Sequence, residues 1–212
     1  MKTMYHIFRE FETKPECGEW HLNLLEEKDT SLVGAIGELI AWKYLSKIGF
    51  SIYRFGSVYF PGIHKGQVGL SDFLSENLIW LDEKQVDYLK NIYKYEARAW
   101  DFIGCRRQYR SRYGRRKIEQ TSSELREAHS KKEEKEIKAK KEALEKLLKK
   151  FLIVDFYLIE IKTRSESSHD LRSLKWKMQT NIPYAKSLGF KPLLIIVTLL
   201  DNWRAKVACK EL

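Results

Sequence analysis

The sequence has few of the residues that build disulfide or zinc sites. Its 212 residues include three cysteines, Cys17, Cys105 and Cys209, which lie far apart and form no Cys-x-x-Cys pair. The five histidines are also scattered. An odd number of separated cysteines is typical of proteins in a reducing compartment, whereas a structural zinc site needs closely spaced ligands. We therefore expect a reducing compartment and no structural zinc site.

Long apolar runs are missing as well. The N-terminal residues do not show the basic-then-apolar pattern of a secretory signal peptide. The longest apolar run, Leu193 to Leu200, is much shorter than the roughly 20 residues that cross a membrane. The sequence therefore predicts a soluble, intracellular protein without a membrane span.

The sequence contains fewer acidic than basic residues, 29 Asp and Glu against 39 Lys and Arg. The formal net charge is +10, and the pI is near 9.4. Such a balance favours polyanionic partners, either nucleic acid or an anionic membrane surface, over acidic proteins. With 43% hydrophobic and 13% aromatic residues, the chain can bury the core of one domain.

The clearest strand signal runs from Phe151 to Lys162 and ends in two opposite charges. Strand side chains alternate between faces, so Glu160 and Lys162 share one face, while Asp155 points to the other. A carboxylate and an ammonium group that project together from a core strand are costly to desolvate. The pair suggests a metal-binding or catalytic role. The alternative is a simple ion pair where the strand enters solvent.

Two further acids lie in segments that read as core material. Apolar residues from Leu32 to Leu45 recur at helical spacing up to Gly49, and Glu38 lies among small residues in this helix. Residues 97–105 read as a short strand with Asp101 in its middle. Each acid has an ordinary alternative, as a surface glutamate or a strand-edge aspartate.

A basic segment with tyrosines follows over residues 106–117. Cations clamp phosphates and tyrosines stack on bases or sugars, whereas a merely solvated charge run needs no tyrosine. The segment therefore predicts contact with nucleic acid. The residues expected to make this contact are Arg106, Arg107, Tyr109, Arg110, Arg112, Tyr113, Arg115, Arg116 and Lys117.

Residues 121–150 are almost entirely Lys, Glu, Ala and Leu and predict one long exposed helix, opened by Ser122 or Ser123. A thin apolar seam runs along it near heptad spacing. The seam consists of Ile137, Leu144, Leu148 and Phe151. We interpret residues 106–150 as a charged insertion between two strands of one core; a solvated low-complexity helix is the alternative. The seam is too thin to favour membrane-surface binding.

The remaining segments complete a mixed α/β pattern. Residues 50–59 alternate as a strand, and helical features lie around residues 82–89. Residues 171–188 show a helical face interrupted by Pro183, and residues 193–200 read as a buried closing strand. The lead-in and the C-terminal residues after 200 give no clear signal.

The order of these elements resembles that of the PD-(D/E)XK nuclease superfamily. A helix with Glu38 is followed by a strand with Asp101, a strand ending in Glu160-Ile161-Lys162, a segment with Gln179, and a closing strand. Within this superfamily the chain resembles archaeal Holliday-junction resolvases and the nuclease-like proteins of archaeal spindle-shaped viruses. The resemblance implies a restriction-endonuclease-like αβββαβ core with a mixed central sheet and a long charged helical insertion.

The resemblance also implies a mechanism and a site. The protein would be a Mg²⁺- or Mn²⁺-dependent endonuclease that acts on DNA, with branched DNA as a candidate substrate, and a viral member would work in the host cytoplasm. Lys162 would position the attacking water, and Gln179 would steady the lysine or the phosphate. The implied metal ligands are the carboxylates of Glu38, Asp101 and Glu160 and the main-chain carbonyl of Ile161.

The chain departs from the family pattern at three places. Trp100 replaces the proline of the motif, and the interval between the second and third motifs is unusually long. Gln179 and Tyr184 are one residue too far apart for the Gln-x-x-x-Tyr signature of the RecB-like branch. Two other functions stay open, a non-catalytic DNA-binding or architectural protein and an RNA-processing nuclease. Since two-strand cleavage needs two sites at a fixed spacing, we expect a homodimer.

Overall fold

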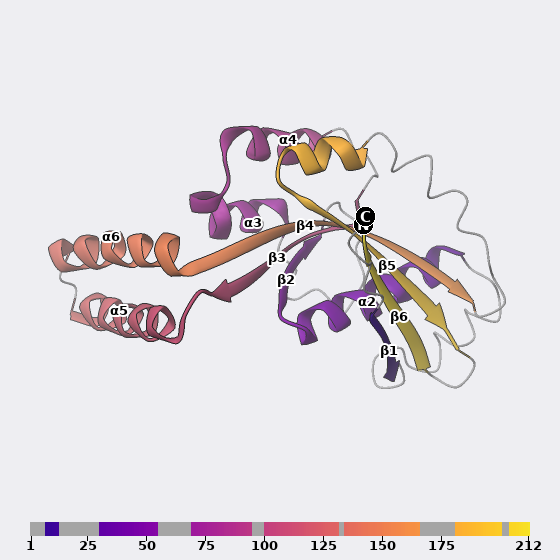
Figure 1. Cartoon of the computed structure of the whole chain (residues 1–212), viewed down its shortest axis with the longest axis horizontal. Helices are drawn as coiled ribbons and strands as arrows, with labels where there is room; N and C mark the ends of the chain where they lie inside the picture. Colours follow the sequence, from indigo (N-terminus) through magenta and orange to yellow (C-terminus); the bar gives the residue numbers. More distant parts are fainter. Residues whose placement is uncertain are drawn as a thin grey trace. The chain divides into compact units, whose positions relative to one another are not determined.

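The structure, a computed structural model, describes residues 7–12, 30–54, 69–94, 100–131, 134–165, 181–200 and 204–212 (Figure 1). The chain divides into two compact units. The first comprises Met1–Cys105 and Phe156–Leu212, and the second is Arg106–Asp155. The insertion expected at 106–150 of a single domain falls within the second unit, which also includes the first residues of the strand after it.

The elements follow the chain with strands at both ends. The strands are β1 (Ile7–Glu12), β2 (Phe50–Arg54), β3 (Phe102–Tyr109), β4 (Leu152–Ser165), β5 (Lys191–Leu199) and β6 (Arg204–Glu211). The helices include α2 (Thr30–Lys47), α3 (Leu70–Asn77), a 3₁₀ turn at Leu78–Trp80, α4 (Glu83–Lys94), α5 (Arg112–Lys131) and α6 (Glu134–Phe151).

The strands form one six-stranded sheet in the order β1-β6-β5-β4-β3-β2. β4 runs parallel to β5, whereas β6 runs antiparallel to both β5 and β1. The predicted mixed α/β class is therefore confirmed. β3 and β4 are neighbours although the whole helical part of the second unit lies between them in sequence, as expected from an insertion between two strands.

Helix α2 covers one face of the sheet. Its apolar residues Ile36, Ile40 and Tyr44 pack on a core of branched side chains from β4, β5 and β6. The helix stops because Gly49 takes a φ of +91°, a left-handed conformation that glycine adopts without steric cost. The chain then turns directly into β2. The main sheet residues of this core are Ile159, Ile161, Ile195, Val197, Ala205 and Val207.

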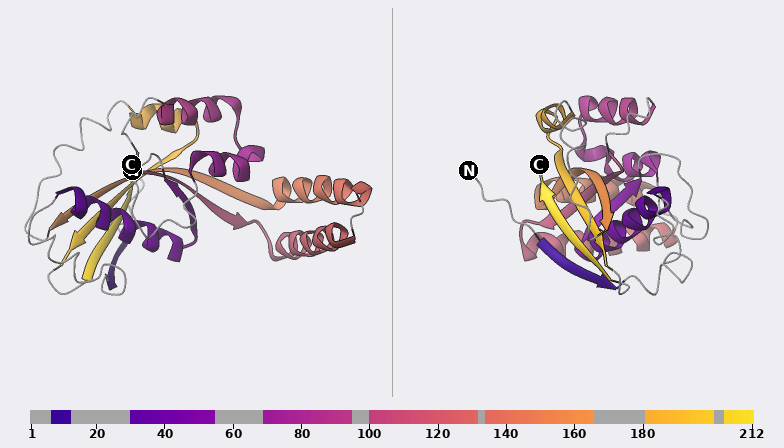
Figure 2. Two further views of the ribbon diagram at one scale, coloured as in Figure 1. Left: turned by 180° about the vertical axis from the view of Figure 1, so that it is seen from behind. Right: turned by 90° about the vertical axis from the view of Figure 1, so that its right-hand side faces the viewer.

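The other face packs against α3, and α4 packs on α3 (Figures 1 and 2). The fully buried ring of Phe73 in α3 contacts Tyr53 of β2 and Phe156 of β4, with centroid distances of 5.2 and 5.7 Å. The start of α4 is fixed by a capping box, in which the N–H of Gln85 donates to Asp82 Oδ1 and the N–H of Asp82 donates to Gln85 Oε1. This confirms the helix predicted around residues 82–89.

The sheet corrects one strand prediction and adds a strand. β3 begins at Phe102, so Asp101 precedes the strand instead of lying in its middle, and residues 97–99 lie outside the described residues. The strand continues to Tyr109, into the segment assigned to the insertion. It extends this far because β4 begins at Leu152 and lies beside it, which gives the basic residues a strand partner. The C-terminal segment forms β6, for which no strand was predicted; buried Ala205, Val207 and Cys209 alternate there with less buried residues, which is an ordinary strand signal.

The single long helix predicted over residues 121–150 is wrong. α5 begins at Arg112, before either predicted cap, and ends at Lys131, and α6 returns alongside it from Glu134 (Figure 1). Folding back partly covers the thin apolar seam, whose four residues are half-buried, whereas one exposed helix would leave them in water. Gly114 of α5 packs directly on the ring of Phe151 in α6, and Ile118 is buried one turn further on.

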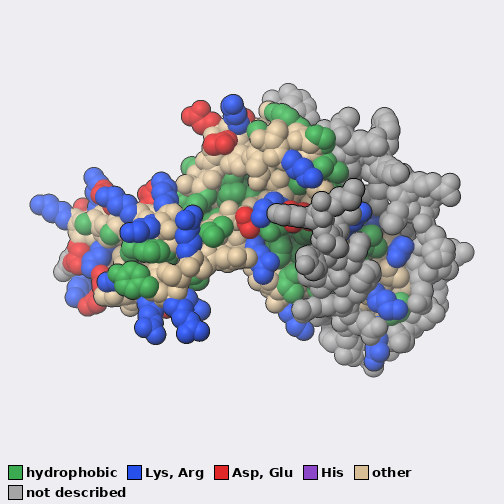
Figure 3. All heavy atoms as spheres, in the orientation of Figure 1, with side chains coloured by type: hydrophobic (Ala, Val, Ile, Leu, Met, Phe, Trp, Pro, Cys, Tyr) green, Lys and Arg blue, Asp and Glu red, His purple; other side chains and the backbone are tan. Residues whose placement is uncertain are grey.

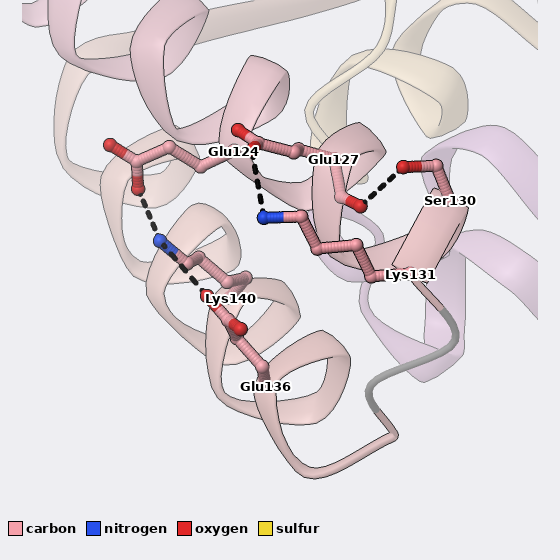
Figure 4. A network of polar contacts seen from close by, with 6 residues as sticks. All are labelled: Glu124, Glu127, Ser130, Lys131, Glu136 and Lys140. Atoms are coloured by element: carbon pink, nitrogen blue, oxygen red, sulfur yellow. Dashed lines mark hydrogen bonds and ion pairs between the residues drawn. The ribbon is translucent and has the colours of Figure 1, made fainter.

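Ion pairs link the two helices of this hairpin. Lys140 of α6 lies 2.5 Å from Glu124 of α5 and 3.8 Å from Glu136 of its own helix (Figure 4). In α5, Lys131 pairs with Glu127 at 2.9 Å. Exposed pairs of this kind contribute little to stability, so packing along the seam is the stronger reason for the hairpin.

Candidate active site

Two hydrogen bonds hold Asp101 against the middle of β4. The main-chain N–H of Asp101 donates to the carbonyl of Ile159 at 2.8 Å. In return, the main-chain N–H of Ile161 donates to Asp101 Oδ2 at 2.6 Å. The bonds bracket Glu160 in the sequence, so the aspartate lies beside this part of β4. A carboxylate that accepts a main-chain N–H is stabilised in its ionised form.

Glu160 and Lys162 form a partly buried ion pair on one face of β4, as their spacing predicts. Lys162 Nζ lies 2.5 Å from Glu160 Oε1. The glutamate side chain is 5% exposed and the lysine 36%, so the ammonium group reaches solvent while the carboxylate does not. Burying such a pair costs desolvation energy that its mutual attraction repays only partly. Structural stability is therefore a weak explanation for this pair.

Glu38 lies on α2, which approaches β4 closely from the face that carries Ile161 and Thr163, opposite to the face of Glu160 and Lys162. Gly37 lies directly against Thr163, the residue after Lys162, and a Cβ atom at position 37 would overlap the threonine side chain. This close approach fixes the height of the next residue, Glu38, along the sheet. The small residues around Glu38 in the sequence thus have a packing role.

Arg54, at the end of β2, is a site residue that the sequence did not indicate. Its guanidinium nitrogen Nη2 forms a short ion pair with Glu38 Oε2, and the two side chains are 10% and 25% exposed. The signal was weak, because an arginine at a strand end is ordinary and its partner lies on the preceding helix. Only the packing of α2 on the sheet brings the two together.

The pKa of Glu38 is raised from 4.5 to about 7. Burial is the largest cause, and the Arg54 guanidinium acts in the opposite direction. The negative charge of Asp101 raises the pKa further, whereas Lys162 lowers it. These influences show that Asp101 and Lys162 lie within electrostatic range of Glu38. Electrostatic interactions therefore connect Glu38 with Arg54, Asp101 and Lys162.

This raised pKa predicts a pH-dependent stability. The folded protein holds the Glu38 proton more tightly than the unfolded chain, so the contribution is full below about pH 4.5 and is lost as the pH rises through 7. Between about pH 5 and about pH 8, the free energy of unfolding of the wild type should fall by about 2 kcal/mol more than that of Glu38→Gln. Denaturant unfolding in the presence of a chelator measures both.

The control for this measurement is Glu142→Gln, a change at an exposed glutamate of α6. Its stability should follow that of the wild type across the same pH range. Parallel curves for the wild type and Glu38→Gln would show that the Glu38 carboxyl does not take up a proton on folding.

The donor set fits a small, hard cation. The described residues contain no group of three or more His, Cys, Asp or Glu side chains arranged to hold a metal ion. Mg²⁺ does not need one, since it usually keeps several waters and binds through one or two carboxylates. Asp101 and Glu160, with the carbonyl of Ile161, offer oxygen ligands of that kind, and the described part of the chain offers no cluster suited to zinc.

The other predicted site residues have different outcomes. Gln179 lies outside the described residues. Among the predicted nucleic-acid contacts, Arg106, Arg107 and Tyr109 lie on β3, Arg110 lies between β3 and α5, and the others lie in the first two turns of α5. All of them belong to the second unit, whereas the site around Glu160 belongs to the first.

No family model, curated protein or solved structure matches the chain. Among the described residues, no helix combines the length and apolar character needed to cross a membrane.

Proposed function

We propose that the protein is a metal-dependent endonuclease that hydrolyses phosphodiester bonds in DNA, with branched DNA such as Holliday junctions as a candidate substrate. One observation carries the proposal. Asp101 is hydrogen-bonded to β4 on both sides of Glu160, and the Lys162 ammonium group lies 2.5 Å from the Glu160 carboxylate. Two carboxylates and an ammonium group placed at the same part of β4 supply the groups that metal-assisted hydrolysis needs.

Each side chain has a distinct role in this proposal. The partly exposed Lys162 orients the attacking water, and the buried Glu160 fixes the direction of the ammonium group. Arg54, held by Glu38, adds positive charge that offsets charge on the scissile phosphate. Asp155, which alternation places on the opposite face of β4, takes no part.

Mg²⁺ or Mn²⁺, when bound, lowers the pKa of a coordinated water and offsets phosphate charge. Asp101 and Glu160 would hold the ion, supported by Glu38 and the carbonyl of Ile161. The raised pKa of Glu38 means that this carboxyl contributes a full negative charge only above about pH 7.

The proposal is tested by incubating the purified protein with end-labelled four-way junction, flap, nicked and plain duplex DNA, and with matched RNA. We expect cleavage of DNA with Mg²⁺ or Mn²⁺ and none with a chelator, because the carboxylates alone cannot activate water efficiently at neutral pH. Binding is followed in parallel by fluorescence anisotropy.

Two outcomes favour the alternatives. Tight DNA binding that is equal with metal and with chelator, without cleavage of any substrate, supports a non-catalytic DNA-binding or architectural protein. Cleavage restricted to RNA supports an RNA-processing nuclease. The homodimer remains a prediction, since the structure contains one copy of the chain.

A further inference from the structure

The positive charge of the protein is concentrated in the second unit. Residues 106–155 contain 17 Lys and Arg and 9 Asp and Glu, a net charge of +8 out of the +10 of the whole chain. The remainder of the chain is close to balanced. Attraction to polyanions, which composition alone assigns to the whole surface, therefore belongs mainly to the helical hairpin and the strand ends that carry it.

Within this unit the charge is separated again, along the length of the hairpin. We define the hairpin base as residues 106–118 and 146–154, which contain ten cations and no acid; the next residue on β4, Asp155, is the one acid of the unit outside the tip. The hairpin tip, residues 119–145, contains seven cations and eight acids. The two parts of the base lie together, because the N–H of Arg110 donates to the carbonyl of Phe151 at 2.8 Å and the Tyr113 ring is 6.0 Å from that of Phe151.

The acids of the tip balance the cations of the tip, whereas residues of the base include no acid to balance the cations there. Ion pairs within the tip join Glu124 to Lys140 and Glu127 to Lys131. Where the base meets the tip, Arg115 pairs with Glu119 and Lys149 with Glu145, so both of these acids come from the tip. The base therefore keeps a strong positive charge. Figure 3 shows Lys and Arg side chains projecting from the hairpin, with exposed hydrophobic side chains among them.

The base also places its cations against the helix dipole. The first turn of α5 contains no acid, and Arg112 and Arg115 lie where the positive end of the dipole disfavours cations. The end itself is capped, since Ser111 Oγ accepts the N–H of Gly114 at 3.0 Å. Cations at this position lower the stability of the helix, and a bound anion would offset their unfavourable interaction with the dipole.

Two tyrosines of the base expose their rings. Tyr109 is 45% exposed and Tyr113 is 62% exposed. Each ring has a cation beside it, with Arg115 Cζ 5.7 Å from the centroid of Tyr109 and Lys117 Nζ 6.0 Å from that of Tyr113. Exposed rings that each have a cation over them combine apolar surface with positive charge, which suits an unpaired base joined to its phosphate.

We propose that the hairpin base is a binding site for single-stranded nucleic acid, which stacks unpaired bases on Tyr109 and Tyr113 and pairs its phosphates with the surrounding cations. The site lies outside the unit with the proposed cleavage centre, and binding there does not depend on cleavage. A plain duplex fits less well, because its bases are stacked on one another and offer no free faces to the tyrosines. An acidic protein would match the charge but would not explain the exposed rings.

Charge variants test where the strand binds. Arg112→Glu with Arg116→Glu changes the base, and Lys135→Glu with Lys138→Glu is the matched change at the start of α6; all four side chains are exposed. Affinity for labelled oligo-dT, measured in a chelator, should fall about tenfold or more in the base variant, with a flatter salt dependence. The tip variant should bind like the wild type. Both variants should remain folded, since each substitutes exposed residues and places one of its two new acids, at position 112 or 135, in the first turn of a helix.

Tyrosine variants test which strand form binds. Tyr113→Ala and Tyr109→Ala should each weaken oligo-dT binding by about tenfold and leave blunt duplex binding unchanged. Tyr184→Ala, at a 57% exposed tyrosine outside the hairpin, should change neither. Equal losses for base and tip variants, or equal losses for single strand and duplex in the tyrosine variants, would overturn the proposal. The chelator separates this result from the cleavage test, which can fail on its own.

Discussion

Glu160→Gln and Lys162→Met should each lower metal-dependent DNA cleavage by at least about a hundredfold. The first change removes the charge of a buried carboxylate, and the second removes the ammonium group that lies 2.5 Å from it. DNA affinity should stay near that of the wild type, because most of the positive charge lies in the other unit. Single-turnover cleavage and anisotropy binding in Ca²⁺ measure the two effects separately.

The matched control uses an exposed ion pair of the same residue types. Glu127 and Lys131 lie 2.9 Å apart on α5, with side chains 65% and 56% exposed. Glu127→Gln and Lys131→Met should retain full cleavage, since an exposed pair contributes little to stability and takes no part in the site. Circular dichroism confirms that each site variant is folded. Full activity in both folded site variants would remove Glu160 and Lys162 from the mechanism.

Strand alternation was enough to predict the part of the site that lies on β4. The two-residue period placed Glu160 and Lys162 on one face of β4, and the ion pair agrees with it. We could also predict that β3 and β4 are adjacent in the sheet, because we treated the charged segment between them as an insertion. Arg54 could not be found in this way, because its partner Glu38 belongs to a helix and the contact depends on how that helix lies across the sheet.

The helical hairpin shows a different limit of the sequence. Lys- and Glu-rich segments satisfy the propensities of one long helix equally well, and the positions of α5 and α6 follow from burial rather than from propensity. The informative residue was Gly114, which the tertiary contact with Phe151 requires. A glycine in an otherwise strong helix-forming segment indicates a close approach by another element.

Gly37→Ala should destabilise the first unit by about 1–3 kcal/mol, although alanine is the better helix former. The added methyl group would overlap the side chain of Thr163, and α2 must shift away from β4 to accommodate it. The same shift moves Glu38, so cleavage should fall together with stability. Denaturant unfolding measures the first effect, and the cleavage assay measures the second.

Gly34→Ala is the control that separates this contact from helix propensity. Gly34 lies one turn earlier in α2, and a Cβ atom there would have no neighbour within 4 Å. That variant should be more stable than the wild type by up to about 1 kcal/mol, because it removes the conformational freedom of glycine without steric cost. Adding Thr163→Ala to Gly37→Ala should restore part of the lost stability. If Gly37→Ala is stabilised as much as Gly34→Ala, α2 does not approach β4 at Thr163, and the placement of Glu38 in the site loses its support.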